Sequence, residues 1–316
     1  MTSNANTSPQ RIFIFDNPRC RSHLFFRLLS THPQLKTHYH PYVLPGCQGP
    51  EKIHYDIYKN NPARAQLVKE LWEPMCSDDY TFANAERHLL DAVAAIEKEG
   101  KTLLSSEHCC YLLKSQILIK HTNSRQLDES WATDPNPTHL PDELWKSVTP
   151  IMVIRHPALS VPSMWRSMAG VPALANMDPM ENHNYWFATL TWSRVLFEAL
   201  RNQGRMPIVV DGEDVCTRTD EVIRGVCGGL GIDPAGVTDT WGPWGQSPLD
   251  HPLFVEMTRT IWESDGVKKH EAKGPVDVDG AVRSVEKEFG AEVAERMRML
   301  IDGEMDNYRF LEQFKV

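Results

Sequence analysis

Four short apolar segments, each followed by a polar turn and a helical pattern, constrain the fold more than any other feature of this sequence. The segments are Arg11–Phe15, Thr102–Ser105, Pro150–Ile154 and Pro207–Asp211. Their β-branched and aromatic residues are typical of strands. Short apolar strands that alternate with helices form a parallel sheet covered on both faces. We therefore predict an α/β fold of the P-loop type, a parallel β-sheet flanked by helices in a three-layer sandwich.

The rest of the chain is predicted to form one domain around this sheet. Residues 1–9 are polar and predict a loose tail, and residues 10–316 show no break in composition that would separate two domains. Predicted helices cover Tyr80–Glu99, closed by Gly100, a segment ending near Gly228–Gly229, and the chain from about Gly280 onward. Pro41–Pro62 is predicted to be a loop, and the polar residues 121–146 a long excursion or lid.

Composition and charge exclude several classes of protein. The net charge of −9 argues against a protein that coats nucleic acid, which needs a basic surface. There is no apolar run long enough to span a bilayer, and residues 1–9 lack the apolar core of a signal peptide. The seven cysteines include no C-x-x-C pair, which is typical of reduced thiols. We expect a cytoplasmic protein without a membrane partner; no heptad run predicts its oligomeric state.

Two strand ends carry basic residues suited to an anion. The first is Asn17–His23, where a helix amino terminus, Arg19, Arg21 and the Ser22 hydroxyl would together favour phosphate or sulfate. The second holds Arg155 and Ser160 on either side of a strand-to-helix turn. The first segment alone is equally consistent with a capped helix and two solvated arginines. The second alone favours a surface arginine and a helix-facing serine. The G-x-x-x-x-G-K-[ST] pattern is absent, which disfavours a kinase-type ATP loop.

Taken together, three segments resemble sulfotransferases in order and spacing. Residues 12–24 (IFIFDNPRCRSHL) are similar to the 5′-phosphosulfate loop, residues 152–160 (MVIRHPALS) to the 3′-phosphate motif, and residues 208–214 (IVVDGED) to a later strand ending in Glu-Asp. His156-Pro157 and the segment 136–142 look most like fungal members, and the resemblance covers roughly residues 11–232.

The resemblance implies 3′-phosphoadenosine 5′-phosphosulfate as the donor, a small-molecule hydroxyl or amine as the acceptor, and no metal. The implied donor-binding residues are Pro18, Arg19, Cys20, Arg21, Ser22 and His23 in the loop, with Arg155 and Ser160 at the 3′-phosphate. Arginines and a helix terminus suit so anionic a donor. Arg19 would also stabilise charge on the transferred group.

The loop departs from the family at Cys20 and Arg21, where members usually carry Ser-Gly. Glycine permits a close backbone approach and a positive φ, both of which cost energy for arginine. Two hypotheses follow: Arg21 supplies extra charge to the donor, or the loop no longer holds it. In the second case the fold would serve elimination, cyclisation or hydrolysis of a metabolite, or bind a nucleotide without catalysis.

Sulfuryl transfer needs a base for the acceptor proton, and family members use His or Glu at a strand end. Glu107 and His108 follow the second strand, and we favour His108 because its ordinary pKa is near neutral. Both are equally consistent with a helix start. His38 and His40 are second candidates; they also suggest a metal, but no third ligand has suitable spacing, so no metal site is predicted.

Two further patterns are interpreted as structural. The aromatic segment Trp186–Trp192 is predicted to be helical core rather than an acceptor pocket. The glycines of Gly225–Gly231 resemble a dinucleotide fingerprint, but they follow a helix rather than a strand. We therefore interpret them as a helix cap.

Overall fold

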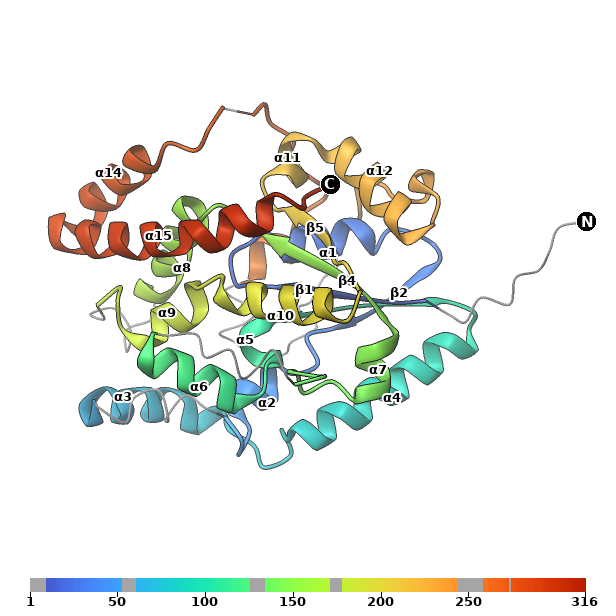
Figure 1. Ribbon diagram of the computed structural model, residues 1–316, viewed down its shortest axis with the longest axis horizontal. Helices are drawn as coiled ribbons and strands as arrows, with labels where there is room; N and C mark the ends of the chain where they lie inside the picture. The colour runs from blue at the N-terminus through green and yellow to red at the C-terminus, as the bar shows by residue number, and fades with distance from the viewer. Residues whose placement is uncertain (1–9, 53–60, 126–133, 171–177, 244–257, 273) are drawn as a thin grey trace, which may run out of the picture.

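The computed structural model describes residues 10–52, 61–125, 134–170, 178–243, 258–272 and 274–316. A five-stranded sheet lies at its centre (Figure 1). The strands are β1 (Arg11–Asp16), β2 (Leu35–Tyr39), β3 (Thr102–His108), β4 (Val148–Ile154) and β5 (Ile208–Asp211). Their order in space is β2-β3-β1-β4-β5, and every neighbouring pair is parallel. The predicted α/β fold with a parallel sheet is confirmed.

Helices cover both faces of this sheet. In chain order they are α1 (Ser22–Leu29), α2 (Val43–Gln48), α3 (Pro62–Trp72), α4 (Phe82–Lys98), α5 (Cys109–Leu112), α6 (Ser115–Ser124), α7 (Asp142–Ser147), α8 (Pro157–Ala169), α9 (Asn182–Ala188), α10 (Thr191–Asn202), α11 (Asp214–Thr217), α12 (Thr219–Leu230), α14 (Val278–Phe289) and α15 (Ala291–Glu312). Two short 3-10 turns, Glu73–Met75 and Pro234–Gly236, and a short helical stretch over 258–262 are also described.

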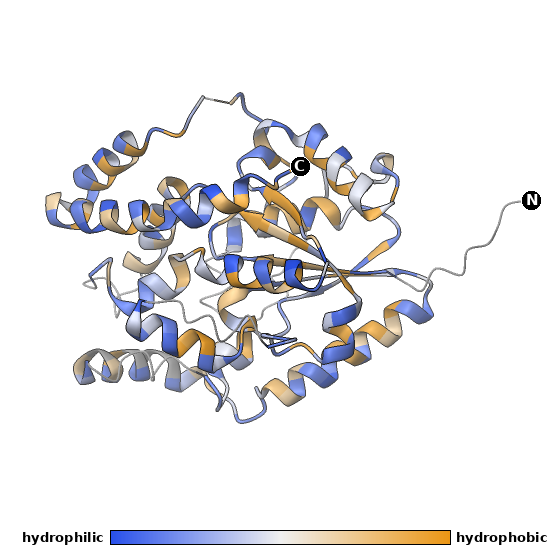
Figure 2. Cartoon of the chain, viewed as in Figure 1, coloured by the Kyte–Doolittle hydropathy of each residue, from blue (hydrophilic) through white to orange (hydrophobic). Residues whose placement is uncertain are grey.

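The alternation of side chains along β1 divides the core into two layers. Phe13 and Phe15 pack on the side of α4, α5, α9, α10 and α15. Ile12 and Ile14 point to the opposite side, toward α1 and α12. All four side chains are fully buried, as expected for a central strand of a parallel sheet. Figure 2 shows the apolar colour of the strands against the mixed faces of the outer helices.

The strands that the sequence predicted are all present, but one strand was missed. β2 has a half-exposed sequence, Leu-Lys-Thr-His-Tyr, and lies at the edge of the sheet. An edge strand needs no continuous apolar run, because part of it faces solvent. This strand carries His38, and His40 follows directly after it.

The helices agree with the sequence at their ends and differ in two connections. Gly100 and Gly231 both adopt a left-handed conformation after their helices, as predicted. The prediction of a loop over Pro41–Pro62 is wrong where α2 forms; residues 53–60 lie outside the described part. The excursion at 121–146 includes the end of α6 and most of α7, with residues 126–133 not described.

The aromatic segment is core, as predicted, since Trp186 and Trp192 are fully buried. The glycine-rich segment ends α12, also as predicted. Within the described ranges there is no helix with the length and apolar character needed to cross a membrane.

The strand order also fixes where a ligand would bind. After β1 the chain builds β2 and β3 on one side, and later β4 and β5 on the other. In sheets of this kind, ligands bind at the carboxyl ends of the strands, where the order changes direction. The loop after β1 lies at this point.

Candidate functional site

The loop between β1 and α1 has an unusual backbone. Arg19 and Arg21 adopt positive φ angles of 68° and 62°, which place both in the left-handed region. Residues with a side chain pay about 1–2 kcal/mol for that conformation. The chain thus keeps the conformation that glycine would give without strain, and it does so with two arginines. Backbone strain held against such a cost is often found where function requires the geometry.

Contacts on both sides hold this loop in place. The Asn17 amide donates a hydrogen bond to the carbonyl of Thr189, and its Oδ1 accepts one from Ser193 Oγ at 3.0 Å. On the other side the loop touches Gly212, which follows β5. A Cβ atom at Gly212 would lie 2.0 Å from the carbonyl oxygen of Cys20. Glycine is therefore required there so that the loop can approach.

Three arginines converge at this loop. Arg155, at the end of β4, donates from Nη1 to the carbonyl of Arg19 at 3.2 Å. Arg155 Nη2 and Arg21 Nη1 lie 3.3 and 3.2 Å from the same carboxylate oxygen of Glu213. His270 lies 3.5 Å from the other oxygen. One acidic side chain thus faces several basic groups, as an anionic ligand would.

Burial and mutual repulsion lower the pKa values of two of these arginines. Burial, with the nearby charge of Arg155, lowers the pKa of Arg19. Burial and the charge of Arg21 likewise lower the pKa of Arg155, although Glu213 opposes this. Both effects mark a place where positive charge is crowded and partly removed from water, and a bound anion would relieve them.

Hydroxyl groups border the arginines. Ser22, in the first turn of α1, is buried, and its Oγ has no hydrogen-bond partner among the described residues. Ser160 is also buried, and its Oγ reaches the carbonyl of His156 only at 3.5 Å. Ser163, one turn further along α8, accepts a hydrogen bond from Arg19 Nε at 3.1 Å. In the described part of the chain, the Ser22 hydroxyl is buried without a hydrogen-bond partner beside a helix amino terminus. It is therefore placed to donate a hydrogen bond to an oxygen of a bound anion.

Cys20 has a structural place in the loop. It is 1% exposed, and burial together with the charge of Asp16 raises the pKa of its thiol, so that it stays protonated. Pro18 is buried beside it. Neither side chain carries charge to a ligand; the backbone of this stretch and the arginine side chains do.

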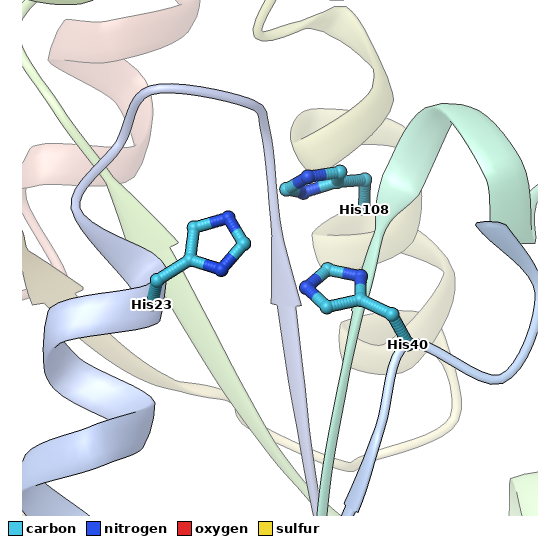
Figure 3. Close-up of side chains that lie close together, drawn as sticks. All are labelled: His23, His40 and His108. Carbon is cyan, nitrogen blue, oxygen red and sulfur yellow. The ribbon is translucent and has the colours of Figure 1, made fainter. Parts of the chain in front are cut away.

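Three histidines meet beside the loop. His23 comes from the first turn of α1, His40 follows β2, and His108 ends β3; Figure 3 shows their rings gathered together. The ring centroids are 5.2 Å apart for His23 and His40, 4.5 Å for His40 and His108, and 5.6 Å for His23 and His108. One ring nitrogen from each lies within 4.8 Å of the others.

Each of these histidines is held by a polar partner at Nδ1. His23 bonds to the hydroxyl of Tyr39, and His108 to the carboxylate of Asp16. Asp16 and His108 are register partners in the sheet, which brings them together. His40 bonds to Glu107 at 2.8 Å. The partners fix the orientation of the rings and leave Nε2 of each to face other groups.

Glu107 holds its surroundings rather than facing a ligand. It is fully buried, and its two oxygens accept hydrogen bonds from His40 Nδ1 at 2.8 Å, from the backbone N–H of His108 at 2.9 Å and from that of Tyr42 at 2.6 Å. Both of its oxygens thus accept from protein donors, three bonds in all. His108, the other base candidate in this strand, is bonded at Nδ1 to Asp16, and among the described residues its Nε2 makes no hydrogen bond.

The surroundings shift the pKa values of His23 and His108 in opposite directions. Burial lowers the pKa of His23 well below its usual value, and His40, His108 and Arg19 add to this. For His108 burial again favours the neutral ring, but the carboxylates of Asp16 and Glu107 outweigh it, so its pKa is raised. His38, by contrast, lies outside the group of three, and burial lowers its pKa.

A hollow of about 520 Å³ opens next to the arginines. It is lined by residues of α11 and α12 and by a later segment: Cys216–Glu221, Arg224 and Lys269–Glu271. Its basic side chains lie among acidic ones; Arg218, for example, is 3.5 Å from Asp214. His270 lines the hollow and lies 3.5 Å from Glu213, so the hollow and the arginine group are neighbours.

The structure thus brings together most of the residues that the sequence singled out. Arg19, Arg21, Ser22 and Arg155 form one group, and His23, His40 and His108 form a second beside it. Sequence reasoning missed several residues in these groups: Asp16, Tyr39, Ser163, Gly212 and Glu213. Of these, only Asp16 and Glu213 had a local signal, because each follows an apolar strand.

Comparison with known proteins gives the site a context. No protein-family model matches the chain. The chain is 24% identical over 239 residues to the sulfotransferase ppzF of Metarhizium majus, covering 68% of this chain and 70% of that protein. It is also 24% identical over 243 residues to the ppzF of Metarhizium rileyi, covering 69% and 70%. The resemblance predicted from the sequence is confirmed: the chain is a divergent, sulfotransferase-like protein.

A solved structure, the sulfotransferase domain of the olefin synthase from Synechococcus PCC 7002, is similar at a TM-score of 0.40 and 15% identity, covering 90% of this chain and 97% of that domain.

Proposed function

We propose that this protein transfers a sulfuryl group from 3′-phosphoadenosine 5′-phosphosulfate to a hydroxyl or amine of a small-molecule acceptor. The observation that carries the proposal is the convergence of Arg19, Arg21 and Arg155 at the amino terminus of α1, where the Ser22 hydroxyl has no partner. The similarity to proteins named sulfotransferases supports the same activity.

Charge favours a polyanionic donor at this place. The chain carries a net charge of −9, so a concentrated basic group is a local exception. Arginines and helix N–H groups bind phosphate and sulfate through charge-assisted hydrogen bonds. Glu213 lies against Arg21 and Arg155, the side chains that the donor would contact. We infer that the donor displaces this carboxylate when it binds.

The hollow beside the arginines has the volume for the nucleoside part of the donor. With the 5′-phosphosulfate at the loop and the 3′-phosphate at Arg155 and Ser160, the adenosine would extend toward α11 and α12. Its lining includes the basic side chains of Arg224 and Lys269 together with acidic ones, and Lys269 lies 3.2 Å from Asp220. This placement supports donor binding from both ends of the molecule.

In the proposed reaction His108 takes the proton of the acceptor. The acceptor oxygen or nitrogen forms its bond to sulfur while the bond from sulfur to the phosphate oxygen breaks. The proton passes to Nε2 of His108, and 3′-phosphoadenosine 5′-phosphate leaves with the bonding electron pair. Asp16, at Nδ1 of the same ring, stabilises the imidazolium that forms. Arg19 stabilises charge on the transferred group.

The test is turnover with the donor and a panel of phenols, aliphatic alcohols and amines, followed by mass spectrometry. We expect a product heavier by SO₃ together with an equal amount of 3′-phosphoadenosine 5′-phosphate. Arg19→Ala should abolish both, and His38→Ala, a histidine outside the group of three, should retain them. Formation of the bisphosphate without any sulfated product, or no consumption of donor across the panel, would contradict the proposal.

A further inference from the structure

The three histidines beside the donor loop have the composition of a metal site. They come from three separate elements, α1, the end of β2 and the end of β3, and one ring nitrogen from each lies within 4.8 Å of the others. Figure 3 shows the rings turned toward the space between them. The sequence argument against a metal rested on the absence of a third ligand near His38 and His40. The fold supplies two further histidines from distant positions.

We propose that His23, His40 and His108 bind one divalent transition-metal ion of the zinc class through Nε2 of each ring. Three histidines with a fourth position left open are the ligand set of catalytic zinc sites. Imidazole also suits copper, iron and nickel, so we choose Zn²⁺ for its known use of three histidines with one open position. The proposal does not rest on sulfuryl transfer: it shares His108 with the proposed reaction, but metal binding is measured without donor or acceptor.

The hydrogen bonds at Nδ1 are those that a metal site requires. Histidine ligands almost always donate their second ring nitrogen to a carboxylate, a carbonyl or a similar group, which fixes the ring and its tautomer. Here Asp16 holds His108, Glu107 holds His40 and the Tyr39 hydroxyl holds His23. All three rings therefore have this support, from residues up to 92 positions away in the chain.

The charges around the histidines leave a place for a dication. Asp16 and Glu107 are both fully buried, and Asp16 Oδ2 has no hydrogen-bond partner among the described residues. Two buried carboxylates facing three imidazoles carry negative charge that a divalent ion would balance. The charge of Arg19 acts on both His23 and His108, and an ion held by three histidines would keep one open position. An anionic or hydroxyl-bearing ligand suits that position.

The geometry is close to that of a loaded site. Zn–N bonds of about 2.0–2.1 Å in a tetrahedron place ligand nitrogens about 3.3–3.4 Å apart. The nitrogens now lie within 4.8 Å of one another. Small rotations of the side chains would close that difference. His40 Nε2 also has a weak contact at 3.4 Å with Ser106 Oγ, which an ion would replace.

A bound ion would change the role of His108. Its Nε2 would be a ligand and no longer free to take a proton. The ion would lower the pKa of a hydroxyl at the open position, whose proton would then pass to water rather than to His108. The free base and the metal are thus alternative uses of one group of residues, and metal binding can be measured without turnover.

The test uses the full chain, without a histidine tag, freed of metal by a chelator and dialysed. Titration with Zn²⁺ by calorimetry should show one ion per chain. Titration with Co²⁺ should give the intense visible absorption of a four-coordinate ion with nitrogen ligands. His23→Ala and His108→Ala should each lose both signals, and His38→Ala should keep both. Asp16→Asn should weaken Zn²⁺ binding by about 10- to 100-fold, as loss of an outer partner does.

Thermal melts of the metal-free variants establish whether each is folded. If His23→Ala is not folded, His23→Gln takes its place in the test. The proposal is overturned if the wild type shows no saturable binding, if the His23 and His108 variants bind like the wild type, or if His38→Ala loses the ion as well. Arg155→Ala should bind Zn²⁺ normally. Failure of zinc binding with intact nucleotide binding would overturn the metal site alone, and the reverse result would overturn the donor site alone.

Discussion

Replacing Glu213 with glutamine should tighten the binding of 3′-phosphoadenosine 5′-phosphate. The Glu213 carboxylate lies 3.2 Å from Arg21 and 3.3 Å from Arg155, so it competes with any anion for both arginines. Glutamine has nearly the same size and keeps an acceptor oxygen, but it lacks the charge. The donor product would then reach the arginines without first breaking two ion pairs.

The size of the effect follows from the exposure of these pairs. The Glu213 side chain is 28% exposed, and those of Arg21 and Arg155 are 27% and 13% exposed. Partly exposed ion pairs contribute about 0.2–1 kcal/mol each, so removing two should tighten binding by about 2- to 30-fold. Because salt screens such charges, the gain should shrink as the ionic strength rises.

Calorimetric titration at low and at high salt measures this effect. Glu295→Gln, which removes the same charge from an exposed position on α15, is the matched control and should leave the affinity unchanged. Equal affinities for the wild type and Glu213→Gln would refute the reasoning, because the arginines would then not be the anion site. Weaker binding by the variant would refute it too, since Glu213 would then support the ligand rather than compete with it.

Two further predictions concern the loop and the base. Gly212→Ala should cost about 1–3 kcal/mol of unfolding free energy, because its Cβ would meet the carbonyl of Cys20 at 2.0 Å. Denaturant unfolding measures this, and Gly228→Ala, where the added Cβ meets open space, should show no such loss. In the metal-free protein, kcat/KM should fall as the pH drops through the raised pKa of His108, because only the neutral ring takes a proton. Asp16→Asn removes the main cause of that rise, so the acid limb of the pH profile should move to lower pH, and an unmoved limb would contradict the role of His108.

Most strands of the sheet were predictable because each is marked in the sequence by a short run of apolar residues. Strand β1 is buried on both faces, so it is a continuous apolar run that ends in polar residues. β4 is likewise a buried apolar run, and β5, although it forms the other edge of the sheet, is buried over three of its four residues. Strand β2 could not be found in this way, since an edge strand with exposed Lys36 lacks the run. The helix ends at Gly100 and Gly231 were predictable because only glycine adopts a left-handed cap without cost.

The donor loop was predictable for the same local reason, but the histidine group was not. Arg19, Arg21 and Ser22 are neighbours in sequence at a strand-to-helix turn. The pairing of Asp16 with His108 joins residues 92 positions apart, and that of His40 with Glu107 joins residues 67 apart. Such contacts depend on the register of parallel strands, which no local pattern contains. The sequence therefore favoured His108 over Glu107 only on its ordinary pKa, and could not show that Glu107 is enclosed by protein donors.

The most direct test of the donor site is a titration with 3′-phosphoadenosine 5′-phosphate, comparing the wild type with Arg155→Ala. Arg166→Ala is the matched control, since Arg166 lies on α8 and pairs with Glu288 at the surface. Hydrogen bonds to charged groups contribute about 1.5–3 kcal/mol, so Arg155→Ala should weaken binding by about 10- to 150-fold while Arg166→Ala leaves it unchanged. No binding to the wild type at millimolar nucleotide, or equal binding to Arg155→Ala, would contradict the account.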